Sequence, residues 1–488
     1  MQRNGIDLHL RAELRSSGDV VVGRMAERAF TRATGADLIT GNAVRILRDA
    51  AEHFPAWLDA IRQAEHTILL ESYIVANDKV GQAFLHALIE RVQAGVRVYV
   101  IYDWFGSMFA QSMWKPLIAA GGHVRGFNPL RIDEPLAWTA RDHRKMLSVD
   151  GAVGFVTGLC ISAKWCGDPA RGIEPWRDTG IEIRGPAVLE LEAAFARAWK
   201  TTGEPLPTDV FARHDIVHAG DTPVRVVASE PETASVFRLD QLVAAVASQR
   251  LWLTDAYFVG ITPYVRALCA AALDGVDVRL LVPGASDLPV VSRLSRAGYR
   301  PLLDAGVRIF EWNGSMLHAK TAVADDWWAR VGSTNLNFAS WMNNYELDVA
   351  VEDERFAHEV AAMYEDDLAN STEIVLGRRK RVIRATPREH GPHHRRALSG
   401  SAARAAAGAL TVGSALGAAL TKSRVLGPAE GSVLATFAAI LCGSAVLALL
   451  FPRLFAIPFA ALTAWMGLAL LWRAARLKRP RKSDVPPS

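Results

Sequence analysis

The sequence predicts an α/β protein in which two tandem β-α-β halves build one active centre, followed by C-terminal transmembrane helices. A motif of the form His-x-Lys-x4-Asp occurs twice, at 143–150 and at 318–325. The order strand, helix, strand also recurs in the two halves, which is typical of an α/β fold. Two long uncharged runs near the C-terminus have the length of membrane spans.

The first half is expected at 38–215, after an N-terminal extension at 1–37 that shows no signal peptide. Apolar periodicity predicts, in chain order, a helix at 44–64, a strand at 66–75, a helix at 80–96 and a strand at 96–106. Gly95 is expected to follow the end of the second helix, because glycine readily adopts the left-handed conformation found there.

The second half is expected at 216–375 and repeats this order. Its apolar segments predict a strand at 248–259, a helix at 263–276 and a strand at 276–284. The polar stretch 201–222, with two prolines, predicts the linker between the halves.

The repeated motif is too specific to be an accident of composition. Two strict copies are expected fewer than ~0.02 times in a random chain of this composition. Lysine makes up 10 of the 55 lysine and arginine residues, yet it stands at both motif positions. An ammonium group and a guanidinium group are not interchangeable, so this choice is informative. The alternative, two separately satisfied histidines in unrelated strands, does not account for the duplication.

The histidine and lysine of each motif are expected to share one face of a strand. Residues two apart on a strand point the same way, so His143 pairs with Lys145, and His318 with Lys320. The apolar runs that follow both histidines predict buried strands with a turn near the motif aspartate.

The other polar positions of the motifs have different expected places. Asp150 and Asp325 each follow their lysine by five residues, which turns them off that face and favours a supporting role. Ser333 and Asn335 are two apart and are expected to line the same face as the second histidine.

Two imidazoles and two ammonium groups in one pocket suit an anion with a tetrahedral centre. The lysine and asparagine groups can bind non-bridging phosphate oxygens. One histidine can attack phosphorus while the other moves protons at the leaving and incoming alcohols. The sequence has no H-E-x-x-H, C-x-x-C or clustered carboxylate ligands, so no metal or other cofactor is expected.

The two motifs resemble the HKD motifs of the phospholipase D superfamily, and the surrounding sequence resembles its bacterial cardiolipin synthase branch. The resemblance covers residues 40–375. It includes ILLESYIVANDKVGQAFLHALIERVQAGVRVYVIYDWFGS, PWRDTGIEIRGPAV, DAYFVG, GVDVRLLVPGASD, LLDAGVRIFEW, MLHAK, GSTNLN and NNYELDVAV. It implies tandem phospholipase D-like halves and phosphatidyl transfer through a phosphohistidine intermediate.

By position, the resemblance implies that His143 is the nucleophile and His318 the general acid and base. Lys145, Lys320 and Asn335 are then the phosphate ligands.

Two further carboxylates occupy matching places in the halves. The resemblance implies that Asp178 and Glu346 orient the histidines; the alternative is that they are ordinary strand-end carboxylates. The chain also departs from the family, because Cys160 stands where the first half usually has the counterpart of Asn335. A thiol is a weak hydrogen-bond donor, so the first half lacks one amide ligand.

The C-terminal part is expected to bind a membrane. A basic linker at 376–404 precedes a membrane region at 405–476, with spans at 431–451 and 454–472 and a basic tail at 477–488. Basic residues at both outer ends predict a helical hairpin with both ends, and the catalytic part, on the cytoplasmic side of the inner membrane. The alternative is a pair of buried helices in a soluble domain.

Together these features favour a membrane-bound phosphatidyltransferase that acts on phospholipids such as phosphatidylglycerol, as cardiolipin synthases do. A phospholipase D that releases phosphatidic acid is the second hypothesis. A nuclease or other phosphodiesterase, or a non-catalytic membrane scaffold, fits less well, and no nucleic acid partner is expected. The membrane anchor favours a lipid substrate because it keeps the site at the lipid surface.

Overall fold

The computed structural model describes residues 27–129, 140–211, 217–231, 233–376 and 382–384, with short pieces between 447 and 468. Within these residues, no helix combines the length and apolar character needed to cross a bilayer. The N-terminal extension, the basic linker, the two expected spans and the basic tail lie largely or wholly outside the described residues.

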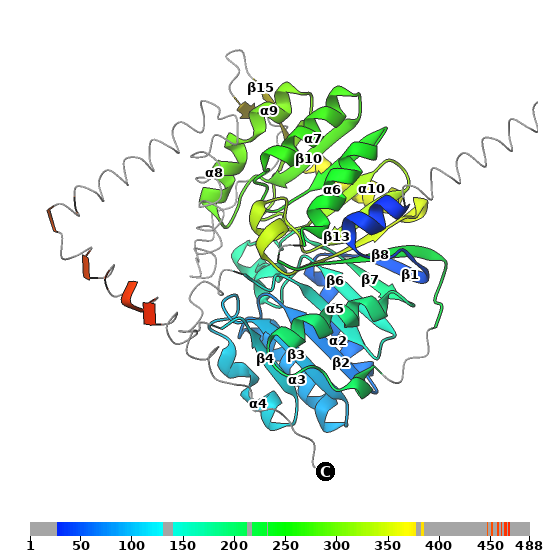
Figure 1. Ribbon diagram of the computed structural model, residues 1–488, viewed down its shortest axis with the longest axis vertical. Helices are drawn as coiled ribbons and strands as arrows, with labels where there is room; N and C mark the ends of the chain where they lie inside the picture. The colour runs from blue at the N-terminus through cyan, green and yellow to red at the C-terminus, as the bar shows by residue number, and fades with distance from the viewer. Residues whose placement is uncertain are drawn as a thin grey trace, which may run out of the picture.

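The described strands form one mixed sheet in the order β16-β15-β11-β10-β9-β12-β13-β14-β8-β1-β7-β6-β5-β2-β3-β4. The strands are β1 Ile39–Arg48, β2 Thr67–Ser72, β3 Arg97–Asp103, β4 His123–Phe127, β5 Lys145–Val149, β6 Val153–Thr157, β7 Thr179–Arg184, β8 Thr222–Ser229, β9 Arg250–Thr254, β10 Asp277–Pro283, β11 Arg308–Trp312, β12 Thr321–Ala324, β13 Trp328–Gly332, β14 Glu346–Val351, β15 Ser371–Leu376 and β16 Val382–Arg384. Strands β2 to β7 lie on one side of the β1–β8 pair, and strands β9 to β16 lie on the other (Figure 1).

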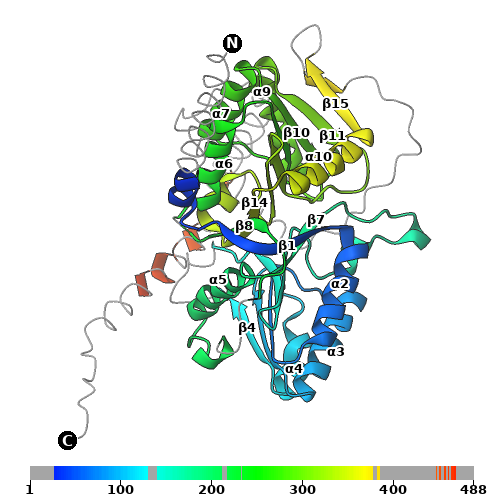
Figure 2. The ribbon, with the colours of Figure 1, turned by 90° about the vertical axis from the view of Figure 1, so that its right-hand side faces the viewer.

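Helices cover both faces of this sheet. They are α2 Asp49–Gln63, α3 Lys79–Gln93, α4 Lys115–Ala119, α5 Val188–Thr201, α6 Ser235–Val246, α7 Thr262–Leu273, α8 Pro289–Ala297, α9 Tyr299–Asp304 and α10 Glu354–Ala369. Figure 2 shows α10 and the pair α6 and α7 on opposite faces of the later strands. Helices α5 and α10 contribute to a single apolar core that joins the inner faces of the two halves.

The expected strand-helix-strand order is present in both halves, with one correction. The helix expected at 44–64 begins only at Asp49, because 39–48 form β1 and pair with β7 and β8. The apolar residues Val44, Ile46 and Leu47 that suggested a helix lie on a strand instead, and the β-branched side chains of Val44 and Ile46 pack well on a pleated surface.

Gly95 follows α3 as expected. Its φ of 91° is left-handed, and the amide of Val96 donates to the carbonyl of Arg91 over 2.9 Å. This hydrogen bond satisfies a carbonyl that the end of a helix otherwise leaves unpaired.

The two motifs lie at the starts of strands rather than inside them, which corrects the expected placement. Strand β5 begins at Lys145, and β12 begins one residue after Lys320. Each histidine therefore lies on a short extended segment that is free to pair with the other half of the chain.

Candidate active site

The two histidine segments cross between the halves. The amide of His143 donates to the carbonyl of Tyr345 over 2.9 Å, and the amide of His318 donates to the carbonyl of Arg177 over 2.7 Å. Each histidine thus pairs through its backbone with the segment that carries the carboxylate of the opposite half. A backbone pairing of this kind fixes the position of both rings.

The imidazole of His143 contacts the carboxylate of Glu346. The distance from Nδ1 to Oε2 is 2.9 Å, across 203 residues of sequence. Ser333 also donates to Oε2 of Glu346, over 2.5 Å, and Asn344 donates to Oε1 over 3.3 Å. The glutamate is fully buried, so these contacts hold it in one orientation.

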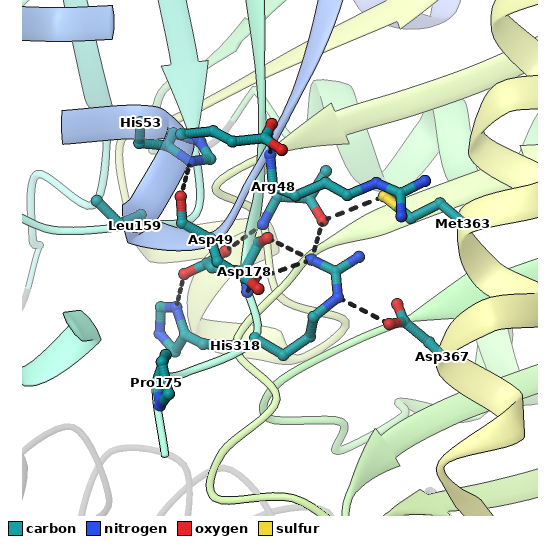
Figure 3. Close-up of polar contacts among 12 residues, drawn as sticks. Arg48, Asp49, His53, Leu159, Pro175, Asp178, His318, Met363 and Asp367 are labelled. Atoms are coloured by element: carbon teal, nitrogen blue, oxygen red, sulfur yellow. Dashed lines mark hydrogen bonds and ion pairs between the residues drawn. The ribbon is translucent and has the colours of Figure 1, made fainter. Parts of the chain in front are cut away.

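The imidazole of His318 has the equivalent partner in the first half. Nδ1 lies 2.8 Å from Oδ2 of Asp178 (Figure 3). The indole of Trp165 donates to the same oxygen over 2.9 Å. Gly158 is required here, since a Cβ on it would lie 2.4 Å from Oδ1 of Asp178. The structure therefore brings Asp178 and Glu346 into contact with the two motif histidines.

The electrostatics of the pocket favour neutral histidines. Burial, and to a lesser extent the nearby lysines, lowers the pKa of both His143 and His318 to about 4. Burial is the largest influence on the pKa of Asp178 and Glu346 and raises it, but the histidine contacts, the motif lysines and the hydrogen bonds from Trp165 and Ser333 together leave both pKa values lowered. A neutral imidazole that donates Nδ1–H to an ionised carboxylate has its lone pair on Nε2.

A second layer of charge holds Asp178 in place. Its amide donates to Asp49 over 2.7 Å, and Arg177 contacts Asp49 at 3.2 Å and Asp367 of α10 at 2.7 Å. Figure 3 shows Asp49 and Asp178 together, with Asp367 approaching from the other half. Asp49 has a φ of 52° at the start of α2, a conformation that this network supports.

The two motif lysines lie behind the histidines. Nζ of Lys145 donates to the carbonyl of His143, and Nζ of Lys320 donates to the carbonyl of His318. Both side chains are fully buried, and burial lowers the pKa of each ammonium group. Neither lysine is among the described residues that line the pocket.

Asn335 and Cys160 occupy corresponding places on the pocket wall. Oδ1 of Asn335 is buried and has no hydrogen-bond partner among the described residues. Burial raises the pKa of the Cys160 thiol, which favours its neutral form. Ser333 differs from the expectation, because it contacts Glu346 of the His143 pair and does not line the pocket beside His318.

The motif aspartates stabilise turns. Asp150 accepts hydrogen bonds from the amides of residues 65–67 over 2.7–2.8 Å. Asp325 accepts from the amides of residues 248–250 over 2.8–3.1 Å. Both have a left-handed φ, of 56° and 49°, and neither lines the pocket. Both aspartates therefore contact the backbone, as a supporting role would require, and the motif spacing had led us to expect such a role.

The chain is similar in sequence to known cardiolipin synthases over most of its length. Residues 242–368 match the family model described as "Cardiolipin synthase, PLD-like domain". The chain is 36% identical to cardiolipin synthase A of Pseudomonas aeruginosa over 371 residues, which cover 75% of this chain and 74% of that protein. It is 33% identical to a cardiolipin synthase of Alkalihalophilus pseudofirmus over 337 residues, 68% of this chain and 67% of that one.

The chain belongs to the cardiolipin synthase family. Its fold also resembles that of phosphatidylserine synthase from Haemophilus influenzae Rd KW20, with a TM-score of 0.57, 13% identity, and coverage of 72% of this chain and 92% of that one. A polyphosphate kinase from Porphyromonas gingivalis has a TM-score of 0.50 at 14% identity, over 76% of this chain and 53% of that one. These two likenesses concern the fold alone.

In this cardiolipin synthase-family protein, the histidines open into a pocket of about 390 Å3 with aromatic walls. The ring of Tyr73 lies 4.9 Å from His143, and those of Trp165, Trp176 and Tyr257 lie 5.5–5.7 Å from His318. None of these four residues was predicted from the sequence to belong to the site. Two of them could have been found, because Tyr73 and Tyr257 follow corresponding strands, β2 and β9, of the two halves.

Among the described residues, no group of three or more histidine, cysteine, aspartate or glutamate side chains is arranged to hold a metal ion. The two motif imidazoles and their carboxylate partners lie together at this pocket.

Proposed function

We propose that this protein is a membrane-bound phosphatidyltransferase that makes cardiolipin from phosphatidylglycerol through a phosphohistidine intermediate. The observation that carries the proposal is the pair of crossed contacts, His143 with Glu346 and His318 with Asp178, around one aromatic pocket. Its relatives named cardiolipin synthases support the substrate class.

In the first step, Nε2 of His143 attacks the phosphorus of phosphatidylglycerol. The bond from phosphorus to the glycerol oxygen breaks, and His318 donates a proton to that oxygen. The negative phosphate near both imidazoles favours the protonated form of His318 and so opposes the burial that lowers the pKa of this imidazole. Glu346 stabilises the positive charge that develops on His143.

In the second step, a hydroxyl of a second phospholipid attacks the same phosphorus. His318 accepts the proton of that hydroxyl, the bond from phosphorus to Nε2 of His143 breaks, and cardiolipin leaves. The neutral amide of Asn335 in the pocket wall can donate a hydrogen bond to a phosphate oxygen, and the ammonium groups of Lys145 and Lys320, behind the histidines, stabilise the negative charge of the phosphate. Oδ1 of Asn335 has no hydrogen-bond partner among the described residues. The side-chain amide is therefore not held in one orientation through this atom and can rotate toward a ligand.

The catalytic part is proposed to consist of the halves 38–215 and 216–375. The membrane region 405–476, with spans at 431–451 and 454–472, would anchor it at the cytoplasmic face of the inner membrane. The uncharged runs and the basic residues around them support this arrangement.

The test is the lipid product formed by the purified full-length protein in vesicles of phosphatidylglycerol. Mass spectrometry should detect cardiolipin and free glycerol in equal amounts, and neither from the His143→Asn or His318→Asn variants. Phosphatidic acid without cardiolipin would instead identify a hydrolase that uses water as acceptor. Unchanged activity in both variants would exclude a catalytic role for this pocket.

A further inference from the structure

Asp287 is an unexpected residue in the wall of a pocket for an anion. Among the described residues that line the pocket, it is the one with an acidic side chain. It lies between β10 and α8, and its side chain is 10% exposed. A carboxylate at this place repels a phosphate group. Asp287 must therefore have a role other than phosphate binding.

The carboxylate of Asp287 is held by groups from both halves of the molecule. The hydroxyl of Tyr257 donates to Oδ1 over 2.8 Å, and Nζ of Lys164 donates to Oδ2 over 3.2 Å. The ammonium group of Lys164 also lies over the ring of Trp176, 4.0 Å from its centre. These contacts fix both oxygens of the carboxylate in the pocket wall, where they face the same space as the histidines.

These contacts place Asp287 on the side of His318 rather than that of His143. Both Tyr257 and Trp176 are ring neighbours of His318, each with a centroid distance of 5.7 Å. Under the proposed mechanism, His318 takes the proton from the incoming alcohol. The carboxylate therefore lies near the place where the acceptor must arrive, separated from His318 by one aromatic ring.

A carboxylate binds hydroxyl groups well, because hydrogen bonds to an ionised acceptor are shorter and stronger than neutral ones. An acceptor with two neighbouring hydroxyls could present one to His318 and the other to Asp287. Water and simple alcohols have no second hydroxyl and would gain nothing from Asp287. A residue of this kind selects the acceptor without taking part in bond making.

We propose that Asp287 is a specificity-determining residue that binds the second hydroxyl of a vicinal diol in the acceptor headgroup. The inference rests on the proposed function and adds to it the basis of acceptor choice. The chemical step is unchanged: the first hydroxyl gives its proton to His318 and forms the new bond to phosphorus, as the bond from phosphorus to His143 breaks. The hydroxyl bound to Asp287 keeps its proton.

The experiment compares two soluble acceptors, 1,2-propanediol and 1-propanol, with the full-length protein in vesicles of phosphatidylglycerol. Wild type should favour the diol, measured as kcat/KM for each phosphatidyl-alcohol product. Asp287→Asn should reduce that preference about tenfold, and Asp287→Ala by about tenfold or more, with little change for 1-propanol. The fraction of phosphatidyl groups transferred to water, which appears as phosphatidic acid, should rise in both variants.

Two control variants distinguish hydroxyl binding by the Asp287 carboxylate from structural effects of the substitution. Lys164→Met breaks the same ion pair but keeps the carboxylate, so it should retain the preference for the diol. Asp209→Asn removes a surface ion pair, with Arg97 at 2.8 Å, and should behave as wild type.

The possible results distinguish the two claims. A wild-type protein that forms no cardiolipin would contradict the proposed function itself. An active wild type with the same acceptor preference in Asp287→Asn and Asp287→Ala would overturn the role of Asp287. An equal loss of preference in Lys164→Met would also overturn it, because the ion pair rather than the carboxylate would then be responsible.

Discussion

At the scale of single residues, the pocket keeps two histidines neutral while surrounding them with charge. Nδ1 of each ring lies 2.8–2.9 Å from a buried carboxylate, and burial lowers the pKa of each imidazole to about 4. A nucleophilic histidine needs its lone pair, so this environment prepares Nε2 for attack before any substrate arrives. The same burial makes the folded protein sensitive to acid.

The free energy of unfolding should therefore fall as pH drops from about 6.5 to about 4. In this range an unfolded histidine binds a proton while the folded His143 and His318 do not. Each such residue contributes a slope of up to about 1.4 kcal/mol per pH unit. Denaturant unfolding at several pH values should show a smaller slope for His318→Asn than for wild type.

The exposed His358 supplies the control for this measurement, because its side chain is 60% exposed. His358→Asn should keep the wild-type slope. Equal slopes for wild type and His318→Asn would show that His318 takes up its proton in the folded protein as readily as in the unfolded one.

At the scale of elements, the turns after β5 and β12 are held by the motif aspartates. Asp150→Asn removes the negative charge that accepts three backbone amides, while asparagine still tolerates the left-handed φ. We expect a loss of about 1–3 kcal/mol of stability, measured as a lower Tm. Asp59→Asn, on the exposed surface of α2, should leave the Tm nearly unchanged. A wild-type Tm in Asp150→Asn would contradict this role.

Helices and strands were predicted correctly where residues within the same segment determine the structure. Gly95 ends α3 because its φ is left-handed, and the repeated strand-helix-strand order follows from apolar periodicity. The strand β1 was missed because its apolar residues also fit a helical period, and pairing with β7 and β8 decided between the two. Propensity within one segment carries no information about such partners.

The residues of the candidate site could be predicted from the sequence, but not which carboxylate contacts which histidine. The motif spacing identified His143 and His318, and matching positions identified Asp178 and Glu346. That each carboxylate contacts the histidine of the other half depends on contacts across 140 and 203 residues. The position of the lysines behind the histidines likewise depends on packing of the two halves.

At the scale of the whole molecule, neither half has a complete histidine and carboxylate pair of its own. The crossed contacts and the bridge from Arg177 to Asp367 join the halves around the pocket. A buried charge that loses its partner is costly, so these contacts also stabilise the relative position of the halves. One active centre from two halves accounts for the two copies of the motif.

The central claim is that the two histidines act in sequence on one phosphorus atom, with His143 as the nucleophile. The most direct measurement is rapid alkaline quenching of the full-length protein with phosphatidylglycerol, followed by mass spectrometry of its peptides. The account predicts a phosphatidyl group on His143, and none in His143→Asn. A modified His318, or turnover of labelled lipid to cardiolipin with no modified histidine at any time, would contradict it.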